Sequence, residues 1–146
     1  MSFLKAMNIS SSGLSAQRVR MNVLSSNLAN ANTTRTPEGG TYKRQDVVFS
    51  ATPTSEDPFG DMLDKDWGTN LKNVQVVDIH KDTNPPRKVF DPNHPDADKE
   101  GYVEMPNIQV MTEMVNMIAA TRAFEANTTA MNAAKSMATK ALEIGR

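Results

Sequence analysis

Cysteine is absent from the 146 residues, which excludes disulfides, thiol nucleophiles and zinc or iron–sulfur sites built on cysteine. Aromatic residues are scarce at 5%, and hydrophobic residues reach only 38%, which is little material for the core of a compact enzyme. The 16 lysines and arginines nearly balance the 17 aspartates and glutamates, so the net charge is −1. We therefore expect neither nucleic acid nor an anionic membrane surface as the main partner.

A long hydrophobic run is also missing. Residues 6–28 are interrupted by polar side chains, namely Asn8, Ser10, Ser11, Ser12, Gln17, Arg18 and Arg20. A secretion signal needs an unbroken apolar stretch, and a membrane-spanning helix needs about 20 mostly apolar residues. We expect no direct membrane insertion, and we expect that a chain of this kind leaves the cytosol, if at all, without a cleaved signal peptide.

The length suits one domain, and the chain divides into three parts. Residues 1–34 form a helical start, residues 35–106 a middle punctuated by prolines, and residues 107–146 a helical end. The predicted fold is mainly α, with long N- and C-terminal helices packing as a coiled coil. The middle segment is predicted to be small, β-rich and loop-rich.

The N-terminal helix is predicted over Ser2–Ala31, because its apolar residues recur at alternating steps of three and four. These residues are Phe3, Met7, Leu14, Met21, Leu24, Leu28 and Ala31, with Ser10 and Gln17 as polar exceptions. Gly13 weakens the helix by about 1 kcal/mol relative to alanine. A bend or a helix start is therefore expected near Ser10–Ser12.

The C-terminal helix is predicted over Asn107–Ile144, bounded by Pro106 and Gly145. An apolar ridge recurs every seven residues, at Val110, Met117, Phe124, Met131 and Ala138, and Met114 and Leu142 extend it. Thr121, Thr128 and Lys135 fall in its gaps. A second seam of mostly small residues contains Ala119, Ala123, Ala126, Ala130, Ala133, Met137 and Ile144.

A helix of about 37 residues would be about 55 Å long at 1.5 Å per residue, far longer than the average globular helix. Two apolar surfaces on such a helix indicate close neighbours on more than one side. A helical hairpin inside a small monomer is the simpler interpretation, and packing against neighbouring copies is the alternative. Periodicity alone does not separate these two interpretations.

The middle segment predicts short strands and loops. Strands are expected at Tyr42–Phe49, Val74–Ile79, Lys88–Phe90 and Gly101–Val103. The alternation of the second strand slips between Val76 and Val77, which predicts a β-bulge there. Residues 50–70 are predicted to be a loop whose candidate surface anchors are Phe59, Met62, Leu63 and Trp67.

No motif predicts catalysis, a cofactor or a metal. His80 and His94 lack the spacing of metal-binding motifs, so we expect structural or solvated roles for them. Asp96–Gly101 resembles the first half of an EF-hand loop, but Asn107 stands where the closing glutamate belongs. We therefore expect an acidic turn there. An enzyme cutting glycosidic bonds would need a carboxylate pair in a cleft, and the sequence singles out no such pair.

Several runs of residues resemble the bacterial flagellar axial proteins, which build the rod and hook. Ser26–Thr33 closely resembles the signature near the end of the N-terminal helix of that family. The match to the family continues over Gly39–Arg44 and Val47–Phe49. The runs that resemble its proximal-rod members are Val89–Asp98, Gly101–Asn107, Glu113–Ile118, Arg122–Asn127 and Lys140–Arg146. Pro53–Asn73 shows no family pattern.

The resemblance implies a non-enzymatic subunit of the proximal rod, the drive shaft that transmits torque from the rotor ring toward the hook. It also implies export through the flagellar type III apparatus, and a location in the basal body where the rod spans the periplasm. The implied partners are other rod proteins, the rotor-ring/export-gate adaptor, and copies or paralogues of the chain in a helical array. Another proximal-rod paralogue and a self-contained helical docking module remain as alternatives.

We expect the assembly interface to use both helical ends. Its predicted residues are Leu14, Met21, Leu24, Asn27, Leu28, Asn30, Met114, Met117, Phe124, Asn127, Met131, Ala138 and Leu142. The amides of Asn27, Asn30 and Asn127 are expected in hydrogen bonds near the helix ends. The methionines suit contacts with non-identical neighbours, because their side chains adapt to irregular surfaces.

Overall fold

The computed structural model describes residues 3–53 and 71–144, in which it places two helices and four strands. In chain order they are α1 (Phe3–Ala29), β1 (Gln45–Pro53), β2 (Lys72–Lys81), β3 (Arg87–Phe90), β4 (Tyr102–Met105) and α3 (Val110–Ile144). The prediction of two long terminal helices around a small β-containing middle is confirmed. The predicted anchors Phe59, Met62, Leu63 and Trp67 lie outside the described residues.

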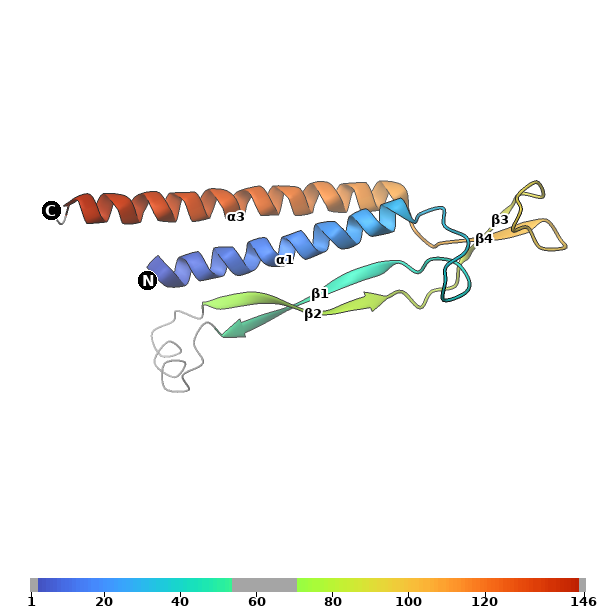
Figure 1. Ribbon diagram of the computed structural model, residues 1–146, viewed down its shortest axis with the longest axis horizontal. Coiled ribbons are helices and arrows are strands. Elements are labelled where there is room, and N and C mark those ends of the chain that lie inside the picture. The colour runs from blue at the N-terminus through green and yellow to red at the C-terminus, as the bar shows by residue number, and fades with distance from the viewer. Residues whose placement is uncertain (1–2, 54–70, 145–146) are drawn as a thin grey trace.

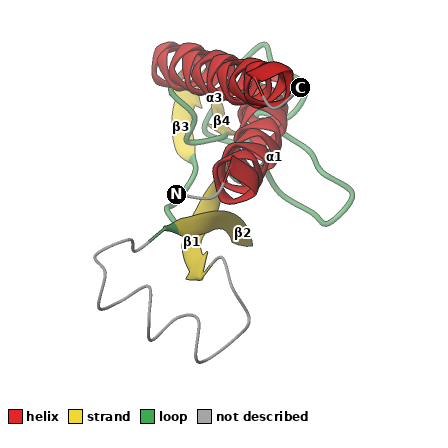
Figure 2. Cartoon of the chain, turned by 90° about the vertical axis from the view of Figure 1, so that its left-hand side faces the viewer, coloured by secondary structure: helices red, strands yellow, loops and turns green. Residues whose placement is uncertain are grey.

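The elements form an elongated stack in which α1 lies between α3 and the β1–β2 sheet (Figures 1 and 2). The start of α1 and the end of α3 lie at one end of the molecule, and the β3–β4 hairpin lies at the other (Figure 1). The helix α1 is thus covered on two sides, whereas α3 packs mainly against α1 among the described elements. One long side of α3 is left uncovered.

The helix α1 runs without interruption through Gly13, so a helix start near Ser10–Ser12 is wrong. The hydroxyl of Ser12 donates to the carbonyl of Ile9 at 2.8 Å and accepts a hydrogen bond from the N–H of Val74 at 3.1 Å. The serine side chain therefore connects α1 to β2 rather than ending the helix. Gly13 faces α3, where its missing side chain leaves room for Asn127.

The covered face of α3 contains a regular alternation of four and three residues, formed by Glu113, Met117, Ala120, Phe124, Asn127, Met131, Ala134 and Ala138. Asn116 and Ala123 are also half-buried and flank this series. Met117, Phe124, Met131 and Ala138 belong to the predicted ridge. The sequence interpretation missed that Ala120, Asn127 and Ala134 complete it, because Thr121, Thr128 and Lys135 were taken as its gap positions, one residue too far along the helix.

The strands β1 and β2 pair antiparallel, and the predicted bulge is confirmed. Val48 pairs with Asp78 while Phe49 pairs with Val76, so Val77 is the extra residue on β2. The first strand begins three residues later than predicted, at Gln45, because the N–H of Tyr42 is already used by the carbonyl of Thr33. The bulge explains the slip in alternation, since one unpaired residue reverses the faces of those that follow.

The strands β3 and β4 form a second antiparallel pair, with Phe90 opposite Tyr102. The connecting segment is the acidic turn that the sequence predicted. Its Asp98 carboxylate accepts the N–H groups of Glu100 at 2.8 Å and Tyr102 at 3.1 Å. Gly101 has φ of 81°, and a side chain there would lie 3.0 Å from the Phe90 ring, so both the backbone and the packing favour glycine.

Over the described residues, neither helix is both long and apolar enough to span a membrane. The N-terminal helix has 27 residues and the C-terminal helix 35, but polar and charged residues recur along both.

Candidate assembly surface

The end of α1, the start of β1 and the start of α3 meet at Asn27, whose side chain is fully buried. Its amide nitrogen donates to the carbonyl of Gln45 at 2.7 Å and to Oε2 of Glu113 at 3.1 Å. Its amide oxygen accepts from the N–H of Gln45 at 2.9 Å and from the Tyr42 hydroxyl at 3.1 Å. The amide thus uses its full hydrogen-bonding capacity and joins three elements.

Glu113 is the other buried polar residue of this junction, with 1% of its surface exposed. Its Oε1 accepts a hydrogen bond from Nε of Arg44 at 2.7 Å, and Arg44 also pairs with Asp46 at 3.3 Å. Burial lowers the pKa of the Arg44 guanidinium, but the hydrogen bond and charge of Glu113, helped by Asp46, raise it more. Arg44 therefore stays charged, and the buried carboxylate keeps a cationic partner.

The residues that follow Asn27 close the end of α1. The Asn30 side chain donates to the carbonyl of Ser26 at 2.9 Å, and its oxygen accepts from the Thr33 hydroxyl at 3.1 Å. The Tyr42 hydroxyl lies 3.2 Å from that of Ser26. Carbonyl groups at a helix end need partners from outside the helix. The hydrogen bonds predicted for Asn27 and Asn30 are present.

Asn127 lies in the middle of α3 instead of near a helix end, which corrects the prediction for its position. Its amide donates to the carbonyl of Ala123 at 2.9 Å. A side-chain carbon at Gly13 would lie 3.1 Å from its oxygen, so the two helices approach closely here. Further along, the Thr121 hydroxyl lies 3.7 Å from the sulfur of Met21.

The remaining predicted interface residues divide into buried or half-buried side chains and exposed ones. Leu24 is buried, and the half-buried ones are Leu14, Met21, Leu28, Met117, Phe124, Met131 and Ala138. Met114 and Leu142 are exposed, at 46% and 75%. The structure thus brings most of the predicted set together between α1 and α3. Met114 lies on the open side of α3, whereas Leu142 lines an apolar groove between the start of α1 and the end of α3.

The sequence interpretation missed further apolar residues on the open side of α3. Met111, Val115 and Ile118 are each more than half exposed. Met111, Met114, Val115 and Ile118 follow the spacing i, i+3, i+4, i+7, which places them on one face of the helix. That spacing was the available signal, but neither of the two surfaces predicted for this helix, the ridge and the small-residue seam, included Met111, Val115 or Ile118.

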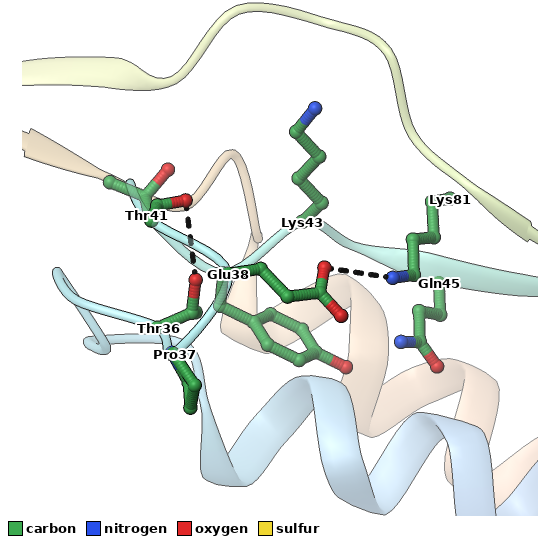
Figure 3. Close-up of a pocket in the computed structure, with 9 residues that line it drawn as sticks. Thr36, Pro37, Glu38, Thr41, Lys43, Gln45 and Lys81 are labelled. Atoms are coloured by element: carbon green, nitrogen blue, oxygen red, sulfur yellow. Dashed lines mark hydrogen bonds and ion pairs between the residues drawn. The ribbon is translucent and has the colours of Figure 1, made fainter.

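A polar pocket of about 370 Å³ lies where residues 36–45 meet β2 (Figure 3). Glu38 and Lys81 pair across it at 3.2 Å, and both side chains are exposed, so the pair is weak. Glu38 is the only carboxylate among the described residues that line it. This pocket lacks the carboxylate pair that glycoside cleavage requires.

The histidines and acids elsewhere do not gather into a site. Nδ1 of His94 accepts the N–H of Asp96 at 3.1 Å, which is the structural role expected of it, and His80 is exposed. Asp96 also pairs with Arg35 at 2.6 Å and accepts from Thr34 at 2.7 Å. Within the residues that the structure describes, no three histidine or acidic side chains lie close enough to hold a metal ion.

Comparison with known proteins gives matches along the whole chain. A family model described as "Flagella basal body rod protein" matches residues 7–35, and one described as "Flagellar basal body rod FlgEFG protein C-terminal" matches residues 99–144. Among curated proteins, the flagellar basal-body rod protein FlgC of Borreliella burgdorferi is 45% identical over 99% of this chain and 98% of that protein.

The FlgC proteins of Bacillus subtilis and Yersinia enterocolitica are 43% and 40% identical, each over the full length of both chains. The shared name favours this member over the other rod paralogues. These relatives are named as rod proteins, which confirms the prediction of a structural protein that is not an enzyme. The chain therefore belongs to the FlgC family of flagellar basal-body rod proteins.

Proposed function

We propose that this chain is a structural subunit of the proximal rod that transmits torque from the rotor ring toward the hook. Residues 1–34 and 107–146 form the helical core of the subunit, and residues 35–106 form its smaller outer segment. The subunit acts in the part of the rod that spans the periplasm, and it reaches that place through the flagellar type III export apparatus, without a cleaved signal peptide.

The observation that carries this proposal is the uncovered apolar side of α3. Met111, Val115 and Ile118 are 69%, 63% and 54% exposed, on a helix that packs mainly against α1 among the described elements. Contiguous exposed apolar surface is unfavourable in a monomer and marks contact with other proteins. Neighbouring subunits that cover this side would bury it, and a helical array supplies such neighbours along its whole length.

The spacing of the covered face supports the manner of packing. Its alternation of four and three residues over 113–138 is the pattern with which helices pack side by side in coiled coils. We propose that the helices of adjacent subunits continue this packing, with copies or paralogues of the chain, other rod proteins and the rotor-ring/export-gate adaptor as neighbours.

The polar junction around Asn27 and Glu113 suits a subunit that transmits torque. Asn27, Glu113 and Arg44 fix the end of α1, the start of α3 and the first strand to one another through buried and part-buried hydrogen bonds. Close-packed interiors have low compressibility and transmit strain. A twist applied to one helix is therefore transmitted to the other helix and to β1 through direct contacts instead of through a flexible loop.

The test is incorporation into the basal body. Cells that lack the chain should be non-motile, and their isolated basal bodies should lack the rod; the wild-type chain should restore both. Val115→Asp, on the uncovered side of α3, should fold but fail to restore the rod, because a charge is costly to bury in an apolar contact.

Thr128→Asp is the matched control on the same helix, since Thr128 is exposed and polar. It should restore motility. Basal bodies with complete rods in cells that lack the chain would overturn the proposed function.

The same polar junction also supports the alternative function, a self-contained helical docking module. The buried pairing of Asn27 with Glu113 holds α1 and α3 together within one chain, so the helices have partners before any assembly. A docking module would keep its full helix content as a monomer and would bind a single partner. Amide hydrogen exchange at the helix ends of the purified monomer distinguishes the two functions, because slow exchange there is expected only of a docking module.

A further inference from the structure

The tip of the β3–β4 hairpin, residues 91–101, is joined to the segment that follows α1. The Asp96 carboxylate on the tip pairs with Arg35 at 2.6 Å and accepts a hydrogen bond from the Thr34 hydroxyl at 2.7 Å. At the base of the hairpin, Val103 of β4 is fully buried. The base is therefore held by packing, whereas Asp96 connects the tip, at the far end of the molecule, to the segment after α1 (Figure 1).

His94 fixes the position of Asp96. Nδ1 of the His94 imidazole accepts the backbone N–H of Asp96 at 3.1 Å. An imidazole nitrogen accepts a hydrogen bond only while it carries no proton, so this contact requires the neutral ring with its proton on Nε2. Pro95 lies between the two residues, and a proline restricts both its own backbone and that of the residue before it. The backbone here thus has little freedom to relieve a conflict between the polar groups of His94 and Asp96.

Protonation of His94 creates such a conflict. A proton on Nδ1 leaves two donors facing each other across 3.1 Å, so the imidazolium must turn to an acceptor. The Asp96 carboxylate belongs to the adjacent donor residue, and its pair with Arg35 is weak, because the Arg35 side chain is 78% exposed. The imidazolium therefore competes with Arg35 for one carboxylate.

We propose that His94 is a pH-sensitive switch: the neutral imidazole holds the hairpin tip against the segment that follows α1, and its protonation releases the tip. Histidine is the side chain whose ordinary titration falls between about pH 5 and about pH 8, so the switch operates near neutral pH. The hairpin base stays in place, because Val103 remains buried in both states.

The charged groups at the tip support this direction of the switch. Arg35, from the segment after α1, and Lys88, from β3, bring positive charge to Asp96 and Asp98. A positive charge on His94 repels the Arg35 guanidinium that Asp96 holds, which adds to the competition for that carboxylate. The charged side chains of the tip itself are Asp91, Asp96, Asp98, Lys99 and Glu100.

The absence of cysteine allows a direct test, because spin labels can be attached at chosen positions of the purified full chain. Lys99→Cys on the tip and Ser25→Cys on α1, both at exposed positions, carry the two labels. Double electron–electron resonance measures the distribution of distances between the labels at about pH 8 and at about pH 5. We expect a narrow distribution at the higher pH and a broader one at the lower pH.

His94→Asn is the matched variant, because its amide oxygen can replace Nδ1 as the acceptor and does not titrate. It should give a narrow distribution at both pH values. His80→Asn removes the exposed histidine of β2 and should behave as the wild type. A wild-type distribution that is the same at both pH values, or a His94→Asn variant that broadens as the wild type does, overturns the proposal.

An NMR titration of the unlabelled wild type gives a second measurement. The imidazole nitrogens of His94, the amide of Asp96 and the side-chain Nε–H of Arg35 should shift with one midpoint, because they respond to one proton. Signals of Asp96 and Arg35 that stay constant while His94 titrates would also overturn the switch. Both experiments use the purified chain, so a negative result leaves the proposed rod function unaffected.

Discussion

The Asn27 side chain connects the end of α1 to β1 and to α3 through hydrogen bonds. Its amide bonds to the backbone of Gln45, to Tyr42 and to Glu113, which is 86 positions away in the sequence. Removing it would leave a buried carboxylate oxygen and the backbone groups of Gln45 without their partner. A buried polar group that loses its partner costs about 1–3 kcal/mol.

We predict that Asn27→Ala lowers the free energy of unfolding by about 2–3 kcal/mol, for that reason. Asn22→Ala, an exposed position on the same helix, should change it by less than about 0.5 kcal/mol. Urea unfolding followed by circular dichroism measures both. Equal losses in the two variants would show that the junction contributes little.

Asp98 gives a pH-dependent prediction. Hydrogen bonds from the N–H groups of Tyr102 and Glu100 lower the pKa of its carboxyl group, so the folded hairpin favours the charged form. The resulting stabilisation is complete above the ordinary pKa of an aspartate, and it is lost as the pH falls through the lowered pKa. The amide resonance of Tyr102 in an NMR titration should move with this transition, and Asp98→Asn should abolish the movement.

At the residue scale, the sequence predicted that certain side chains form hydrogen bonds, but it did not predict with which residues. Asn27 and Asn30 were expected to be hydrogen-bonded, because an amide near a helix end can satisfy its free carbonyls. The pairing of Asn27 with Glu113 was not predicted, since no local pattern connects two residues 86 positions apart. The role of Gly13 was misinterpreted because helix propensity describes an isolated helix, whereas Asn127 of α3 occupies the space that the glycine leaves.

The helix pair provides a prediction at the scale of elements. Gly13→Ala should gain about 1 kcal/mol from helix propensity, but its new side chain would lie 3.1 Å from the Asn127 oxygen. We expect the substitution to stabilise the chain by about 1 kcal/mol in an Asn127→Ala background and by at least about 0.5 kcal/mol less in the wild-type background. A double-mutant cycle on thermal unfolding measures the difference. Additive effects would mean that the helices do not touch there.

Leu28 and Phe124 test the covered face of the two helices. Both are half-buried, so a charge at either position would lie in an apolar contact. We predict that Leu28→Asp and Phe124→Asp together abolish rod assembly, and electron microscopy of isolated basal bodies would show rings without rods. Motile cells with normal rods that carry both substitutions would refute this. Ser25→Asp, an exposed position near Leu28, serves as the control.

The elements themselves were largely predictable. Proline and glycine bounded α3 to within three residues, and the broken alternation at Val76 and Val77 located the bulge. The apolar face of α3 was found only in part, because Met117 and Phe124 marked every seventh position while Ala120 and Asn127 are too small or too polar to stand out. Which face meets α1 and which stays open depends on tertiary packing, and periodicity alone does not determine it.

On the scale of the whole molecule, the two ends of the helix pair differ in the contacts described for them. The Asn27–Glu113–Arg44 junction lies at the end of the helix pair where α1 finishes and α3 begins (Figure 1). At the opposite end, Phe3 and Ala6 face an open apolar groove. Helices without tertiary partners are marginal in water, so the two ends of the pair should differ in stability before assembly.

We predict that amide hydrogen exchange in the purified monomer is slow near Leu24–Ala29 and Glu113–Ala120 and fast near Phe3–Met7 and Ala138–Leu142. In isolated basal bodies all four segments should exchange slowly, because neighbouring subunits would cover the open end. Slow exchange of all four segments in a verified monomer would contradict the prediction and would favour a preformed docking module. Since the monomer and the assembly contain the same chain, a difference confined to the open end would locate the helical surface that assembly covers.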